Sequence, residues 1–327
     1  MTVAARLVAR TTRLDDDVDL LAFAGDEGLL FESTEHGLAG RGAAARIDLP
    51  TGAHRSTGAA DVVARALAEL SVEDEVGRPG TGPVAFAAIP FDDDAPAVAT
   101  VPALVLGRAA DGTRWVTRIG TAGSDRDAAA DDDPLQPGAR AGGAGPSRFD
   151  VSSTRAPVDW CDAVATARDR IRAGELTKVV LAREVVVAAD APISAADVLA
   201  RLRAAYPSAY RFSIDGFVGA SPELLVSRGG DIVRSQPMAG TAARSGDPSA
   251  DARLAASLLA SAKDLSEHRI TIDAVLDTLL PFCSYVDAEA EPSVVAVANV
   301  QHLATLVTGR LSCRSRTGGA CRGRRRW

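Results

Sequence analysis

Aromatic residues are scarce in this chain: 4% of the 327 residues are Phe, Trp or Tyr, whereas 46% are hydrophobic. A core must therefore be built mainly from Ala, Val and Leu. No apolar run approaches the roughly 18 residues of a membrane span, and the first residues, MTVAARLVARTTRLDDD, contain no long apolar segment before a cleavage site. We therefore expect a cytoplasmic protein with neither a membrane span nor a signal peptide.

Cysteine and basic charge are also limited. The four cysteines form no C-x-x-C pair, which argues against a zinc or redox motif. The formal net charge is −7, whereas a general nucleic-acid binder would show a basic face. With only four His and no Ser-His-Asp context, a hydrolase triad also has little support.

Composition divides the chain into parts, and its length allows one large domain or two ordinary ones. Residues 123–155 begin with a stretch rich in Gly, Ala, Asp and Pro and almost without large apolar residues, which predicts a loop or linker. We expect an N-terminal half at 1–122, a catalytic half at 156–311 and an Arg-rich tail at 312–327.

Hydrophobic periodicity and turn residues predict mixed helices and strands. Asp215-Gly216 and Gly229-Gly230 each separate two short strands, and two hairpins in succession imply an antiparallel sheet rather than a doubly wound nucleotide-binding fold. In the second half, helices are predicted at 156–173, from Ser194 to 205, at 248–261 and at 263–280, and strands at 177–187, 210–214, 217–220, 223–227, 232–235, 293–299 and 304–311.

Lys178 stands in the otherwise apolar segment TKVVLAREVVV. On a strand it would share a face with Val180 and Ala182, where an unpaired buried lysine is costly. It could be an edge-strand lysine that discourages aggregation, which the spacing alone favours, or a desolvated lysine that acts as a base.

Carboxylates form the second group of candidates. Glu223 follows Pro222 at the join of two predicted strands, where the proline restricts the backbone and would hold the carboxylate. Most glutamates in such a position are solvated loop residues, which is the alternative. Asp264 and Glu267 are three residues apart on a predicted helix and share a face. They could hold Mg²⁺, which prefers oxygen ligands, or form a solvated acidic surface.

Three further positions are open to two interpretations each. Gly240-Thr241 follows a predicted strand and could present backbone N–H groups to an anion or form an ordinary turn. His268 and His302 could contribute to a site or be hydrogen-bonded structural residues. None of these motifs decides the function alone.

Their order and spacing, however, resemble the chorismate-binding family. The matching segments are TKVVLAR (177–183), GASPEL (219–224), QPMAGTA (236–242), SAKD (261–264), Glu267-His268 and QHLAT (301–305). The segment VAFAAIPFDDD (84–94) also resembles the family. The resemblance extends to about residue 311.

The resemblance implies an α+β fold of stacked antiparallel β-sheets flanked by helices, and chorismate as substrate. Isochorismate synthases of the family add water at C2 and expel the C4 hydroxyl; salicylate synthases go on to eliminate pyruvate. Anthranilate and aminodeoxychorismate synthases use ammonia, usually from a glutaminase partner. Lys178 resembles the water-activating base, where the anthranilate branch usually has Gln, and Gly240-Thr241-Ala242 resembles isochorismate synthases. The resemblance therefore favours a monomeric isochorismate synthase without a glutaminase, and a salicylate synthase is the alternative.

The resemblance also implies a role for each candidate residue. Lys178 would take a proton from water, and Glu223 would protonate the departing hydroxyl. Glu267, with Asp264 nearby, would hold Mg²⁺, which would clamp the ring carboxylate of the substrate. Gly240, Thr241 and His302 would line the substrate site. The product would feed siderophore or menaquinone synthesis.

After Leu311 the resemblance ends. The last residues, SCRSRTGGACRGRRRW, hold six Arg and no aliphatic residue larger than Ala. Family members continue with a His-Pro-Thr-Pro-Ala segment, further strands, a substrate-binding Arg, a Gly-x-Gly loop and a second Mg²⁺-binding Glu. We expect a frame shift or truncation here rather than a nucleic-acid-binding tail, so that the fold is incomplete and the chain is poorly folded, inactive or both. A non-catalytic remnant is thus a third hypothesis.

Overall fold

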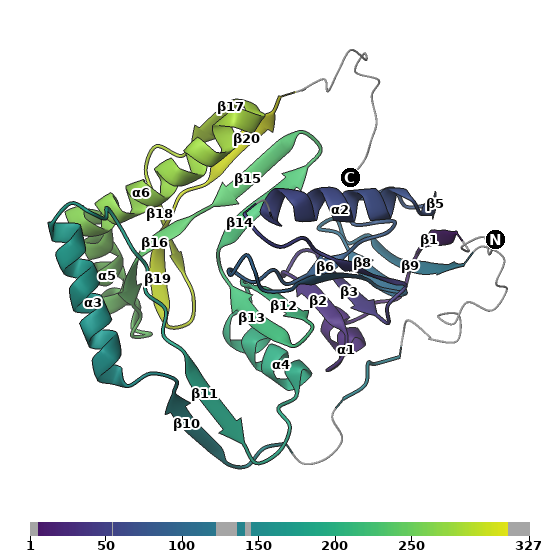
Figure 1. Cartoon of the computed structure of the whole chain (residues 1–327), viewed down its shortest axis with the longest axis horizontal. Coiled ribbons are helices and arrows are strands. Elements are labelled where there is room, and N and C mark those ends of the chain that lie inside the picture. The colour runs from purple at the N-terminus through teal and green to yellow at the C-terminus, as the bar shows by residue number, and fades with distance from the viewer. Residues whose placement is uncertain (1–5, 54, 122–135, 141–144, 313–327) are drawn as a thin grey trace. The chain divides into compact units, whose positions relative to one another are not determined.

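The computed structural model describes residues 6–53, 55–121, 136–140 and 145–312 (Figure 1). Their contacts form two compact units. The first contains the described residues up to 140 together with 194–222, and the second contains 145–193 and 223–312. Residues 194–222, which we placed with the catalytic half, lie in the first unit because the strand Tyr210–Ile214 pairs with the strand Leu29–Glu32.

The first unit is built on an eight-stranded sheet of order β13-β12-β2-β3-β8-β9-β1-β5, in which only β1 and β5 run parallel. A smaller sheet has the order β4-β7-β6. The elements are β1 (Leu7–Arg13), α1 (Leu20–Ala24), β2 (Leu29–Glu32), β3 (Gly37–Arg41), β4 (Ala45–Asp48), α2 (Arg55–Ala68), β5 (Ser71–Asp74), β6 (Phe86–Ala87), β7 (Val98–Val101), β8 (Leu104–Arg108), β9 (Arg114–Thr121), α4 (Ala195–Ala205), β12 (Tyr210–Ile214) and β13 (Phe217–Ser221).

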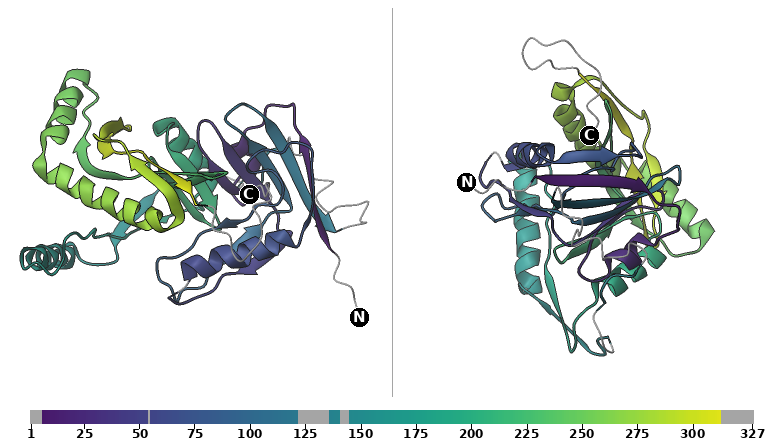
Figure 2. Two further views of the ribbon diagram at one scale, coloured as in Figure 1. Left: turned by 90° about the horizontal axis from the view of Figure 1, so that it is seen from above. Right: turned by 90° about the vertical axis from the view of Figure 1, so that its right-hand side faces the viewer.

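Small aliphatic residues fill the core of this unit, as the composition predicts. Helices α1 and α4 bury Leu21, Phe23 and Leu199 against β-strand residues such as Leu30 and Leu106. Helix α2 packs against the small sheet (Figures 1 and 2), where Ala59 and Val63 lie in one cluster with Ala99. None of the helices in the described ranges combines the length and the hydropathy that a membrane-spanning helix requires.

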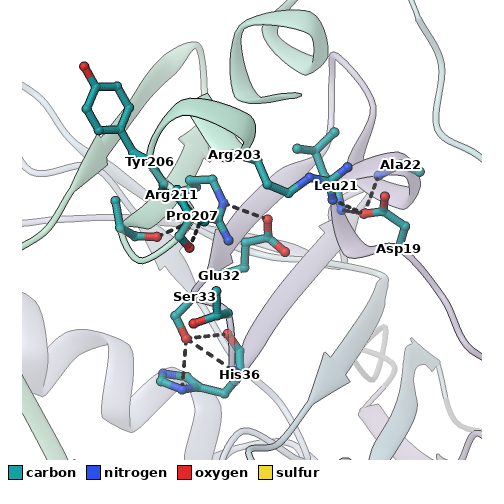
Figure 3. Close-up of polar contacts among 12 residues, drawn as sticks. Asp19, Leu21, Ala22, Glu32, Ser33, His36, Arg203, Tyr206, Pro207 and Arg211 are labelled. Carbon is teal, nitrogen blue, oxygen red and sulfur yellow. Dashed lines mark hydrogen bonds and ion pairs between the residues drawn. The ribbon is translucent and has the colours of Figure 1, made fainter. Parts of the chain in front are cut away.

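A buried ion pair joins β12 to β2 in the first unit (Figure 3). Arg211 and Glu32 are cross-strand partners, and the Arg211 Nε donates to Glu32 Oε1 at 3.0 Å while both side chains are almost fully buried. The same guanidinium also donates to the backbone carbonyls of Pro207 and Ala209. The pair is therefore well satisfied, which a buried charge requires.

The second unit has three sheets, of order β14-β15-β20-β17, β16-β19-β18 and β10-β11, and all pairings are antiparallel. Helix α6 lies along β16 and β19 (Figures 1 and 2). The elements are β10 (Phe149–Ser153), α3 (Pro157–Arg172), β11 (Val185–Ala189), β14 (Leu224–Gly229), β15 (Ile232–Gln236), β16 (Met238–Ala243), α5 (Pro248–Ala260), α6 (Ala262–Leu279), η1 (Leu280–Phe282), β17 (Cys283–Ala288), β18 (Ser293–Ala296), β19 (Val300–Ala304) and β20 (Val307–Leu311).

The expected α+β class with antiparallel sheets is confirmed, and so are the predicted helices and hairpins of the second half. The Asp215-Gly216 turn has positive φ at both residues, as a tight hairpin turn requires. Ser194 caps α4 by accepting from the Asp197 N–H.

One strand prediction is wrong. The strand expected from Thr177 begins only at Val185, so Lys178 lies in an irregular segment. The strand expected at 304–311 is observed as β20, which begins at Val307, and residues 305–306 separate it from β19. The expected linker at 123–155 includes β10, and residues 313–327 of the Arg-rich tail lie outside the described residues.

Candidate active site

The second unit brings the candidate residues around one strand, β16, and one helix, α6. Helix α6 begins at Ser261, whose side chain accepts from the Asp264 N–H as an N-cap. Strand β16 pairs with β19 and also contacts α6. Because β16 contacts both β19 and α6, it can bring its own backbone groups, His302 of β19 and the carboxylates of α6 into one region.

Gly240 fixes the approach of β16 to α6. Its φ is +81°, and a Cβ at this position would lie 3.2 Å from the Cβ of Asp264 and 3.3 Å from the Leu303 Cδ1. The pairing of β16 with β19 is also irregular between Ala239 and Thr241. Glycine is therefore required here both for its backbone conformation and for its lack of a side chain.

Thr241 and His302 face each other across β16 and β19. They are register partners, and the Thr241 Oγ1 lies 2.9 Å from the His302 Nδ1. This contact fixes the orientation of the imidazole, so the predicted substrate-lining residues Gly240, Thr241 and His302 are brought together.

Glu223 is held at the start of β16. Its Oε1 accepts a hydrogen bond from the Met238 backbone N–H at 3.2 Å, and the residue is half-buried. The carboxyl group is therefore positioned rather than freely solvated, in agreement with a functional role for this residue. Whether it donates a proton stays a prediction.

Lys178 reaches α6 from the irregular segment that precedes β11. Its Nζ donates to the Thr271 Oγ1 at 2.9 Å and lies 3.5 Å from the Glu267 Oε1. The lysine side chain is 22% exposed. Because Lys178 is not on a strand, the interpretation as an edge-strand lysine has no basis in this structure.

His268 is a structural element of the same region. Its side chain is buried, and its Nε2 lies 2.8 Å from the Thr305 Oγ1. Burial, reinforced by the positive charge of Lys178, lowers the pKa of the imidazole. His268 ties α6 to the end of β19, as expected for a hydrogen-bonded core histidine.

The carboxylates of Asp264 and Glu267 are oxygen ligands of the type that Mg²⁺ prefers, but they are only two. Asp264 and Glu267 are one helical turn apart, with side chains 21% and 37% exposed. Within the described ranges, no group of three or more His, Cys, Asp or Glu side chains is placed to hold a metal ion. Mg²⁺ is commonly bound through one or two protein carboxylates, with water and substrate oxygens completing its shell, so this pair fits that mode.

Sequence reasoning missed Thr271 and Thr305. Thr271 lies one helical turn after Glu267 and therefore shares its face, which was a usable signal. A second signal is compositional: Lys178 and Lys263 are the two lysines among 36 basic residues. In a chain that uses Arg almost everywhere, a lysine in an apolar segment suggests a role that Arg cannot fill.

Comparison with known proteins identifies the family of this chain. The family described as chorismate binding enzyme matches residues 25–317. The chain belongs to this family. It is 39% identical over 247 residues to a Mycobacterium tuberculosis protein provisionally assigned as the isochorismate synthase MenF; the match covers 72% of this chain and 59% of the relative.

Two further relatives agree with this assignment. Isochorismate synthase DhbC of Bacillus subtilis is 37% identical over 175 residues, which cover 50% of this chain and 44% of that protein. The structure of MenF, the menaquinone-specific isochorismate synthase from Escherichia coli, shares the fold with a TM-score of 0.70 at 22% identity, and the match covers 94% of this chain and 71% of the other. The chain thus spans about 59% of the length of the M. tuberculosis relative.

Proposed function

We propose that this protein is an isochorismate synthase. The observation that carries the proposal is the placement of Lys178, whose amine lies against the Glu267 carboxylate and the Thr271 hydroxyl on α6. The identity to relatives named isochorismate synthases supports the same reaction. The assembled site also favours an enzyme over a non-catalytic remnant.

In the proposed mechanism, one residue removes a proton and a different residue donates one. Lys178 accepts a proton from the water molecule whose oxygen bonds to C2 of chorismate. Glu223 donates a proton to the hydroxyl that leaves C4, and the ring double bonds shift between these positions. One water molecule enters and one leaves, so the product is an isomer of the substrate. General acid–base catalysis of this kind contributes about 10²–10⁴-fold to a rate.

Mg²⁺ belongs to this proposal. Glu267 and Asp264 would hold the ion, which would neutralise the ring carboxylate of the substrate. Gly240 leaves space beside Asp264, and Thr241 orients His302 within the substrate site. We also propose that the enzyme acts as a cytoplasmic monomer without a glutaminase and supplies isochorismate to siderophore or menaquinone synthesis.

The test is a chromatographic assay of the purified 327-residue chain with chorismate, with and without Mg²⁺, and with circular dichroism on the same sample. We expect isochorismate to form only with Mg²⁺. K178Q, which removes the amine from a half-buried, irregular segment, should keep the circular dichroism spectrum and lose activity about 10²–10⁴-fold.

Other outcomes separate the alternatives. Salicylate together with pyruvate would identify a salicylate synthase. A folded protein that forms no product would contradict the proposal and support the remnant hypothesis, together with the sequence-based expectation of an inactive chain. Anthranilate formed with ammonia would identify the branch that uses a glutaminase.

A further inference from the structure

The Lys178 amine has two polar neighbours on α6, both on one helical turn. Its Nζ donates to the Thr271 Oγ1 at 2.9 Å and lies 3.5 Å from the Glu267 Oε1. These two contacts with one face of α6 fix the position of the Lys178 Nζ on the helix.

The Thr271 hydroxyl is restricted to the role of acceptor toward Lys178. Its own hydrogen is donated to the Glu267 backbone carbonyl, with an oxygen–oxygen distance of 3.2 Å. A hydroxyl has one hydrogen and two lone pairs, so this bond leaves only lone pairs for Lys178. The Thr271 hydroxyl is thereby anchored to the backbone of α6 while it accepts from Lys178.

We propose that Thr271 is a positioning residue that holds the Lys178 amine in place beside the attacking water. The inference rests on the proposed function, in which Lys178 is the base. Thr271 does not touch the reacting atoms in this scheme and acts only through Lys178. A misplaced catalytic group can reduce a rate about a hundredfold, so the contact has measurable consequences.

The chain offers a matched control on the same helix. The Thr278 Oγ1 donates to the Ala274 carbonyl at 2.7 Å, which is the same bond to the residue four positions earlier. Thr278 is exposed and lies two helical turns beyond Thr271. T278V therefore measures what the loss of such a bond does to α6, and T271V adds the loss of the contact with Lys178.

The first arm of the experiment is steady-state kinetics with chorismate and Mg²⁺. We expect T271V to reduce kcat about tenfold to a hundredfold with KM changed less than about twofold. T271S keeps the hydroxyl and should retain activity close to wild type, and T278V should match wild type. A kcat of T271V equal to wild type, or a T271S variant as impaired as T271V, would overturn the proposal.

The second arm does not depend on turnover. Lys178 and Lys263 are the only lysines of the sequence, and the Lys263 side chain is 84% exposed. Limited reductive methylation with isotope-labelled formaldehyde, read by peptide mass spectrometry, therefore reports each amine separately. We expect T271V to speed the labelling of Lys178 at least about threefold relative to Lys263, and T271S and T278V to leave the ratio unchanged.

The two arms separate failure of the inference from failure of the proposed function. If the wild-type chain makes no isochorismate, the proposed function fails, and the catalytic role of Thr271 fails with it. The labelling ratio then decides whether Thr271 holds Lys178 at all. An unchanged ratio in T271V would reject the contact, and with it the positioning role, whatever the kinetics show.

Discussion

The Thr241 hydroxyl lies 2.9 Å from the His302 Nδ1, and the two residues are register partners on adjacent strands. The contact holds the imidazole of His302 in one orientation beside Gly240. In the proposed site, both residues meet the substrate rather than the groups that move protons.

T241V therefore tests the substrate-lining role. Loss of one hydrogen bond of about 0.5–1.5 kcal/mol should raise the KM for chorismate about twofold to tenfold and leave kcat nearly unchanged. Steady-state kinetics measure both constants. T308V serves as the control, because Thr308 lies on β20 and is paired with Arg234 and Asp287 rather than with His302. A fall in kcat without a change in KM would place Thr241 in the chemistry instead.

Substitution of Gly240 should be more damaging than the same substitution at Gly246. Both residues have a similar left-handed conformation, with φ of +81° and +84°, but a Cβ at Gly246 meets nothing within 4 Å. The backbone conformation alone costs about 1–2 kcal/mol for alanine, so urea unfolding should show this loss in both variants. G240A should lose more, because its methyl group presses on Asp264 and Leu303. Equal losses in the two variants would show that the contact with α6 is unimportant.

The buried pair of Arg211 and Glu32 should matter far more than an exposed pair. E32Q leaves the Arg211 charge buried without its counter-ion, and breaking a buried pair in this way costs about 3–5 kcal/mol. The pair of Arg10 and Glu73 has side chains that are 44% and 63% exposed, so E73Q should cost at most about 1 kcal/mol. Urea unfolding followed by circular dichroism compares them, and similar losses would contradict the structure of the first unit.

Asp251 should make stability depend on pH. Its pKa lies below the usual value of 3.8, chiefly because the Ser245 backbone N–H donates to it, with the Ser245 hydroxyl and the Arg244 charge adding. The native state therefore favours the ionised carboxylate. This contribution is complete above the ordinary pKa and is lost as the pH falls through the lowered native pKa.

D251N removes that contribution, so it should be less stable than wild type at pH 7. The difference between the two proteins should shrink as the pH falls below about 3.8. Urea midpoints at pH 7, 5 and 3 measure the trend. A difference that grows toward pH 3 would contradict the assigned direction of the shift.

Local patterns predicted much of the second half of the chain. Glycine turns identified the hairpins of β12 to β15, and helical periodicity identified α6. The strand expected at Lys178 failed because an apolar, β-branched run is equally compatible with an irregular segment, and tertiary contacts decide between them. Propensity also could not place residues 194–222 in the first unit, since that depends on pairing between distant strands.

The part of the candidate site that lies in the ordered family motifs could be predicted from the sequence. Resemblance indicated Lys178, Glu223 and the β16 and β19 residues, and the structure brings Gly240, Thr241 and His302 together. Thr271 lies in no matching motif, and Thr305, although the last residue of QHLAT, was given no role. Their roles depend on which side chain arrives from another element, and a single sequence does not contain that information.

The most direct test of the central claim is the reaction in ¹⁸O-labelled water, with the product analysed by mass spectrometry. Activation of solvent water by Lys178 predicts isochorismate with one ¹⁸O atom, in the C2 hydroxyl, and release of the original C4 oxygen as water. Isochorismate without ¹⁸O would show that the hydroxyl migrates within the substrate, and any other product would reject the proposed reaction.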